Sequence, residues 1–166
     1  MILQEAKDTA ATLEPPQMFT QSLLSMEQFS YKHSGAKSNN LKFLKDKLDS
    51  NIKLPESACV PFQMAEYSID LEPDVKKKLE SLAQRMQNIK SVKKMNKMLY
   101  QCKDLVLGLK FHDNDPHQKF MKEQLINFGI QANQWEQAWK SIKKVWASKY
   151  NERAFLAVKK LGVHVD

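Results

Sequence analysis

Two stretches of the chain combine positive charge with groups that could bind a polyphosphate. The first, residues 35–40 (GAKSNN), is a glycine turn with a lysine, placed where an amphipathic helix is predicted to begin. A glycine lets a ligand approach the backbone closely, and a helix start presents unpaired N–H groups with partial positive charge. Lys37 adds a full positive charge at that point. The second stretch is a later aromatic helical segment that carries Arg153.

Neither stretch is specific by itself. The turn lacks the GxxxxGK[ST] pattern of a Walker loop, and the pattern alone favours a capped turn with a surface lysine. For Arg153 it favours a salt bridge with a carboxylate such as Glu152, or stacking on an aromatic ring. No histidine has the spacing of a metal ligand, although His33 is close to the glycine turn. Asp113 and Asp115 are typical of helix caps rather than of magnesium ligands.

Length and composition indicate one globular domain. The 166 residues are 42% hydrophobic and 27% charged, and no apolar run approaches the roughly 20 residues that span a bilayer. The net charge of +7 rests almost wholly on lysines spread over polar helix faces, with Arg85 and Arg153 the only arginines, so we expect no nucleic-acid partner. Cys59 and Cys102 lack CxxC spacing and are expected to be buried, reduced thiols. We expect a soluble protein of the cytoplasm or a plastid, with no membrane partner.

The first half of the chain predicts few regular elements. Residues 1–25 are expected to form an N-terminal tail or linker helix, followed by a short strand at 26–31. After the Gly35 turn, Ser38 or Asn39 is expected to cap a helix with an apolar face of Leu41, Leu44 and Leu48. Residues 58–62 then predict a short buried or edge strand.

The second half predicts a series of amphipathic helices. One begins at Pro73, a second follows a break at 88–91, and a third is capped by Asp115 and ended by Gly129. The last has a three-four apolar period from Trp135 to Leu161 that contains all three tryptophans, so it must pack against a large apolar surface. The chain is therefore predicted to be helix-rich α+β with a small sheet and a long C-terminal amphipathic helix.

These residues also resemble a known family. Residues from about 26 to 160 are similar to the start of the nucleotide-binding domain of the α-glucan, water dikinases, which is related to the ATP-binding domain of pyruvate phosphate dikinase and phosphoenolpyruvate synthase. The matches are GAKSNNLK at 35–42, IKLP at 52–55, VPF at 60–62 and WEQAWKSIKKVWASKYNERA at 135–154. The last block is long and tryptophan-rich, and residues 72–129 match only in helical pattern.

The resemblance implies that residues 26–166 are the N-terminal part of an ATP-grasp-like nucleotide-binding domain. In that family the β-phosphate of ATP passes to a histidine and then to a glucosyl unit of a starch-like α-glucan, with AMP and orthophosphate as by-products. By the same resemblance, Gly35, Lys37, Ser38, Asn39 and Arg153 would contact ATP. Mg²⁺ would be the metal, with its ligands outside this chain.

The resemblance also predicts what this chain does not do alone. None of its four histidines matches the family's phosphohistidine motif, so we identify no catalytic residue. The α-glucan would bind through domains that are absent here. We therefore expect a fragment or truncated product that is inactive by itself. The alternatives are the ATP-binding part of a pyruvate- or phosphoenolpyruvate-type dikinase, and a non-enzymatic basic helical interaction module.

Overall fold

The computed structural model describes residues 22–49, 51–89, 91–153 and 155, and most of them are helical. The elements follow in the order β1 (Leu24–Ser25), η1 (Met26–Gln28), α1 (Ala36–Lys47), β2 (Ala58–Cys59), α2 (Phe62–Asp70), α3 (Pro73–Gln87), α4 (Val92–Leu107), α5 (Pro116–Asn127), η2 (Ala132–Gln134) and α6 (Trp135–Ala147). The strands β1 and β2 form one antiparallel pair, with Leu24 opposite Cys59. The predicted helix-rich α+β class with a small sheet is confirmed.

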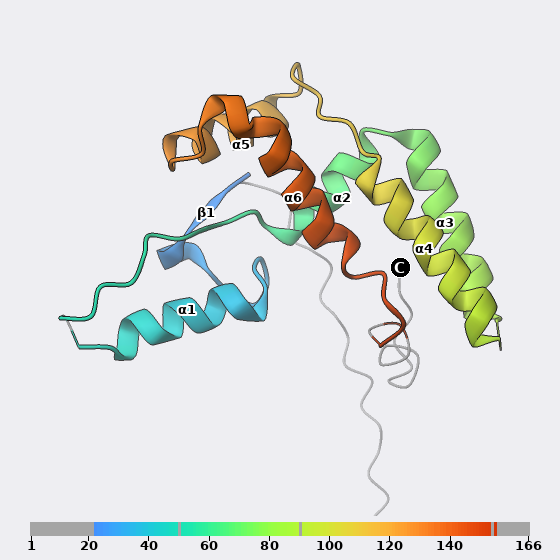
Figure 1. Cartoon of the computed structure of the whole chain (residues 1–166), viewed down its shortest axis with the longest axis horizontal. Helices are drawn as coiled ribbons and strands as arrows, with labels where there is room; N and C mark the ends of the chain where they lie inside the picture. Colours follow the sequence, from blue (N-terminus) through green and yellow to red (C-terminus); the bar gives the residue numbers. More distant parts are fainter. Residues whose placement is uncertain (1–21, 50, 90, 154, 156–166) are drawn as a thin grey trace, which may run out of the picture.

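Helix α6 crosses the middle of the molecule. In Figure 1, α5 lies at its upper end, α4 and α3 lie to its right, and α1 and β1 lie to its left. Helix α4 lies between α6 and α3, and it packs against both of them. The arrangement follows from the apolar stripes of these helices, because each can be buried only against another element.

Two apolar clusters meet on α6. The hairpin cluster lies between α3 and α4 and includes Ala147 from the end of α6. The tryptophan cluster joins α2, α5 and α6 through the buried side chains of Met64, Trp135 and Trp139. Trp146 packs against both clusters and lies edge-on to Trp139, with ring centroids 5.4 Å apart. The prediction that the tryptophans pack on a large apolar surface is therefore confirmed.

Methionine supplies an unusual share of the buried interior. The buried methionines come from four helices and the turn η1, and they are Met26, Met64, Met86, Met95, Met98 and Met121. An unbranched thioether fills irregular gaps between helices more readily than a branched side chain does.

Polar side chains hold α2 against α5. Gln118 is fully buried on α5, where its Oε1 accepts from the backbone N–H of His112 at 2.7 Å and its Nε2 donates to Ser68 Oγ at 3.1 Å. Asp115 caps α5 by accepting from the Gln118 backbone N–H at 2.8 Å, and it also accepts from the Tyr67 hydroxyl at 2.6 Å. The buried polar atoms of this link are satisfied, so they do not incur the cost of unpaired groups.

Several predicted boundaries are confirmed. Helix α3 begins at Pro73, and α5 begins at Pro116 after its Asp115 cap. Gly129 follows the end of α5 with φ of 120°, a left-handed conformation that only glycine adopts easily. The strand predicted at 58–62 is present as its first two residues.

The two cysteines are free thiols. Cys102 is buried as expected, whereas Cys59 is only half-buried.

Other predictions are wrong. The strand expected at 26–31 is instead a 3-10 turn and a loop, because Gln28 and Ser25 form a capping box that bends the chain just after β1. Helix α2 was not predicted, because the proline-flanked start of that segment favours a strand. The apolar face expected on α1 is only partly covered, and Leu44 is 42% exposed.

The last helix is shorter than predicted. It ends at Ala147, and residues 148–151 form turns before a helical segment resumes at Glu152. The backbone N–H of Ser148 bonds back to Lys144, and the hydroxyl of Ser148 donates to the Val145 carbonyl at 2.6 Å, which completes the end of the helix. The residues expected to continue the stripe to Leu161, and most of the predicted 1–25 tail, lie outside the described residues. Within the described ranges, each helix is either too short or too polar to cross a bilayer.

Lys143 links α6 to the end of α4 by hydrogen bonds, and we expect these bonds to stabilise the fold. Its ammonium donates to the carbonyls of Leu107 at 2.7 Å and Leu109 at 2.8 Å, and burial lowers its pKa. Lys143→Met keeps the aliphatic stem but removes both bonds, so we expect a loss of about 1–3 kcal/mol in the free energy of unfolding by urea. Lys140→Met, at an exposed position on the same helix, should change it by less than about 0.5 kcal/mol. Equal losses in the two variants would contradict this role.

The thiol of Cys102 should be inert in the folded protein. Its side chain is 1% exposed, and burial raises its pKa to about 11. In a Cys59→Ser background at about pH 8, we expect Ellman's reagent to react with Cys102 about a hundredfold more slowly in native protein than in denaturant. Burial favours the neutral thiol, so ionisation of Cys102 should not affect the free energy of unfolding below the ordinary pKa of a thiol. Above that pKa the unfolded chain ionises first, so the protein should become less stable as the pH rises towards and through about 11. Similar native and denatured rates would refute its burial.

Candidate functional site

The glycine turn at the start of α1 has an ordinary backbone. Gly35 is the N-cap residue, with φ of −68° and ψ of 164°, which is an extended conformation open to any residue. A Cβ added there would lie 3.9 Å from the ring of Phe62, at a normal contact distance. The fold therefore does not require a glycine at this position. Close approach of a ligand to the backbone would be a separate reason for a glycine at position 35.

Asn39 fixes the turn rather than capping the helix. Its side chain is buried, and its Nδ2 donates to the Ser34 carbonyl at 2.9 Å and to the Gly35 carbonyl at 3.0 Å. The Ser34 hydroxyl donates in turn to the Ser30 carbonyl at 2.9 Å. The predicted cap at Ser38 or Asn39 is therefore wrong, because the Asn39 amide points back into the preceding loop. Asn39 could shape a ligand site here, but its amide is already engaged.

The loop before the turn is attached to the start of α2. The Phe62 backbone N–H donates to the His33 carbonyl at 3.1 Å, and His33 Nδ1 lies 3.2 Å from Gln63 Nε2. On the other side, the Lys42 ammonium donates to the carbonyls of Glu27 at 2.7 Å and Phe29 at 3.1 Å. These bonds hold the start of α1 in a fixed place beside α2 and η1.

The first turn of α1 is open to an anion. The first bond of the helix is from the Asn39 N–H to the Gly35 carbonyl at 3.1 Å, so the N–H groups of residues 36–38 precede the ladder. The N-cap residue, a glycine, has no side chain to cap them, and no side chain in the described part of the chain does so. Lys37 is exposed, and Ser38 is half-buried. Uncapped N–H groups at the positive end of a helix, with a lysine beside them, suit phosphate oxygens.

Arg153 lies on a different part of the molecule. It follows the end of α6, whose last residues pack with Tyr150 against the hairpin cluster. The neighbouring Glu152 accepts from Asn96 Nδ2 of α4 at 2.6 Å, whereas Arg153 is exposed. Two cavities are formed by described residues, one at the other end of α1 and one between α3 and α4, and neither is lined by Lys37 or by Arg153. The joint ATP contact of these residues therefore stays a prediction.

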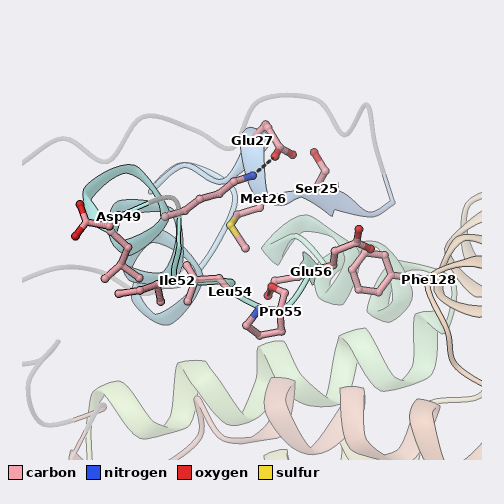
Figure 2. Close-up of a pocket in the computed structure, with 12 residues that line it drawn as sticks. Ser25, Met26, Glu27, Asp49, Ile52, Leu54, Pro55, Glu56 and Phe128 are labelled. Atoms are coloured by element: carbon pink, nitrogen blue, oxygen red, sulfur yellow. Dashed lines mark hydrogen bonds and ion pairs between the residues drawn. The ribbon is translucent and has the colours of Figure 1, made fainter.

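One of these cavities lies at the other end of α1 and was not foreseen from the sequence. It has a volume of about 460 Å³ and an apolar floor that includes Met26, Leu54 and Phe128 (Figure 2). Three carboxylates and one lysine line it: Glu27, Asp49, Glu56 and Lys45. The Lys45 ammonium, 2.7 Å from Glu27, lowers the pKa of that carboxyl to about 2. This excess of negative charge is unsuited to a triphosphate.

The role of Asn39 can be tested by stability at α1. Asn39→Ala removes the amide donor from the buried Ser34 carbonyl and leaves the Gly35 carbonyl with only the backbone N–H of residue 39, so we expect α1 amides to lose about 1–3 kcal/mol of protection in native-state hydrogen exchange. Asn40→Ala, at the exposed neighbouring position, should change this protection by less than about 0.5 kcal/mol. Unchanged exchange in Asn39→Ala would show that the turn does not depend on this side chain.

Comparison with known proteins supports the family resemblance. The chain is 34% identical over 157 residues to "Alpha-glucan water dikinase, chloroplastic" of Solanum tuberosum, covering 86% of this chain and 10% of that protein. It is 32% identical over 142 residues to "Alpha-glucan water dikinase 2" of Arabidopsis thaliana, covering 83% of this chain and 11% of that protein. A protein of Citrus reticulata with the same name as the Solanum tuberosum relative is 30% identical over an alignment of 168 residues, covering 95% of this chain and 11% of that relative.

The similarity is confined to sequences. No family model matches the chain, and no solved structure matches it, so the ATP-grasp-like fold stays a prediction. The chain spans about a tenth of the length of the curated relatives it matches. Within that stretch, the resemblance to the α-glucan water dikinases is confirmed, and the chain is related in sequence to one segment of these proteins.

Proposed function

We propose that this chain supplies part of the nucleotide-binding surface of a dikinase, with the start of α1 contacting the phosphates of ATP. The observation that carries the proposal is the uncapped first turn of α1 beside exposed Lys37. Its N–H groups and the lysine are the kinds of donor that bind phosphate oxygens. Gly35, Ser38 and Asn39 shape this turn, and Arg153 would add a second contact only if it meets the same nucleotide.

The proposed reaction is that of a glucan dikinase. The β-phosphate of ATP would move to a histidine elsewhere in the enzyme and from there to an α-glucan, leaving AMP and orthophosphate. The names of the relatives, which contain both glucan and dikinase, support this substrate class. The share of this chain would be to hold and orient the nucleotide, because binding and charge neutralisation dominate phosphoryl transfer. Alone, it would be inactive.

We assign no Mg²⁺ ligand in this chain. Among the described residues, no three histidine, cysteine or acidic side chains are grouped as a metal site would need. Asp113 forms an ion pair with Lys122 at 3.0 Å, and Asp115 caps α5. In the proposed enzyme, a magnesium ion would neutralise phosphate charge from ligands outside the described part of the chain.

We also propose that the enzyme to which this segment corresponds is located in a plastid. The Solanum tuberosum and Citrus reticulata relatives are named as chloroplastic, which supports this location. A plastid is also where a starch-like glucan would be the acceptor.

Nucleotide contact can be tested by NMR titration of the 166-residue chain with ATP. We expect shifts centred on residues 35–39, and we expect Lys37→Ala to weaken binding by about tenfold, since a hydrogen bond to a charged group contributes about 1.5–3 kcal/mol. Lys47→Ala removes the same charge from the opposite end of α1, and it should leave the affinity nearly unchanged. Gly35→Ala should fold normally but bind more weakly if a phosphate approaches the backbone there.

Two results would refute the proposed contact. One is the absence of any shift at about 10 mM ATP, which is tenfold above the weak end of usual substrate affinities. The other is a set of shifts confined to lysines of α3 and α4, with no difference between Lys37→Ala and Lys47→Ala. That pattern would mean general attraction of an anion to a basic surface.

A further inference from the structure

The α3–α4 hairpin has an open groove that the proposed nucleotide contact does not use. The groove has a volume of about 660 Å³, and Val75, Leu82 and Leu105 form its apolar floor. In Figure 1 these two helices lie at the edge of the molecule, with α6 beyond α4 on the inner side. The groove therefore lies between the two helices at the edge of the fold.

The rim of the groove is basic. Lys77, Lys78 and Arg85 line it from α3, and Asp104 is the single acidic side chain in its lining. All four are exposed, and none forms an ion pair with another described residue. Lys77 and Arg85 are eight residues apart on one helix, so they lie on the same face, two turns from each other.

This combination selects one kind of ligand. An apolar floor gains free energy only from a ligand that buries apolar groups, which a polyphosphate or a nucleic-acid backbone does not. The guanidinium of Arg85 forms two-bond pairs with carboxylates and phosphates alike, so the apolar floor is what favours a peptide over a polyphosphate. Asp104 on α4 would repel any anion, so the carboxylates of the ligand must lie along α3, with a neutral or cationic group beside Asp104. A third helix fits naturally into the space between two antiparallel helices.

We propose that the groove between α3 and α4 docks an amphipathic helix of a partner protein, with its apolar stripe on Val75, Leu82 and Leu105 and its carboxylates along the α3 rim. Charge complementarity determines which flank of the partner helix faces α3, because its acidic side chains must lie beside Lys77 and Arg85. The proposal does not depend on nucleotide binding at α1, since the two surfaces share no lining residue.

The test uses a labelled helical peptide and the full chain. The peptide, about 15 residues long to match α3, carries leucines at i, i+4, i+7 and i+11, with glutamates on one flank and glutamines on the other. In fluorescence anisotropy at about 0.15 M salt, we expect it to bind with a dissociation constant of about 100 μM or tighter. A peptide with serines for the leucines, and one with lysines for the glutamates, should each bind at least about tenfold more weakly.

Matched variants locate the contact. Lys77→Glu combined with Arg85→Glu should weaken binding of the acidic peptide by about tenfold or more. Lys93→Glu combined with Lys94→Glu makes the same charge change at exposed positions of α4 outside the groove, and it should weaken binding by less than about twofold. Circular dichroism and the thermal midpoint confirm that both variants are folded.

Three outcomes overturn the proposal. The first is failure of the leucine–glutamate peptide to bind within this range. The second is an equal loss in the two variants, which would mean long-range attraction to the whole basic surface. The third is equal binding by the serine peptide or tighter binding by a single-stranded RNA of similar length, which would assign the rim to a polyanion and leave the apolar floor without a role.

Discussion

The packing of Trp146 between two apolar clusters is the interaction on which the rest of this structure depends. On one side it touches the cluster of α3 and α4, and on the other it touches the cluster that holds α2 and α5. Lys143 adds a polar link from the same helix to the end of α4. Helix α6 therefore holds the α3–α4 hairpin in place relative to α2 and α5, together with the direct packing of α2 on α3.

Much of the helical framework could be predicted from the sequence because its signals are local. Glu72-Pro73 and Asp115-Pro116 mark helix starts through backbone chemistry that needs no distant partner, and Gly129 marks an end in the same way. Helix α2 has no such signal, because its proline-flanked start favours a strand, and buried Gln63 and Ser68 also interrupt its apolar pattern. Their burial is stabilised by hydrogen bonds to other segments, which a local pattern does not contain.

At the candidate site too, the sequence predicted the local features and missed those that depend on distant segments. The sequence identified the turn before α1, and the structure contains an uncapped helix start there with Lys37 exposed. It could not indicate that the Asn39 amide is engaged with Ser34 and Gly35, because that bond depends on the path of the preceding loop. It also predicted an unbroken helix through Arg153, since apolar periodicity continues across the turn at 148–151. Periodicity reports which side chains are buried and not whether the backbone between them is continuous.

Charge is unevenly placed around the molecule, despite a net value of +7. The cavity at the far end of α1 has an acidic rim, whereas the start of α1 and the α3–α4 groove present cations. An anion drawn to the chain is thus directed to two regions and away from a third. The two basic regions differ in what lies beside the charge. One offers backbone N–H groups, and the other offers an apolar floor.

The methionine-rich interior has a consequence for the life of the protein under oxidising conditions. Six thioethers are shielded while the helices stay packed. If the chain opens and oxidants reach them, each becomes a polar sulfoxide that is costly to bury among apolar side chains. Damage acquired during a brief opening would then prevent the helices from closing again, so reductases that repair methionine sulfoxide would determine how long a molecule survives.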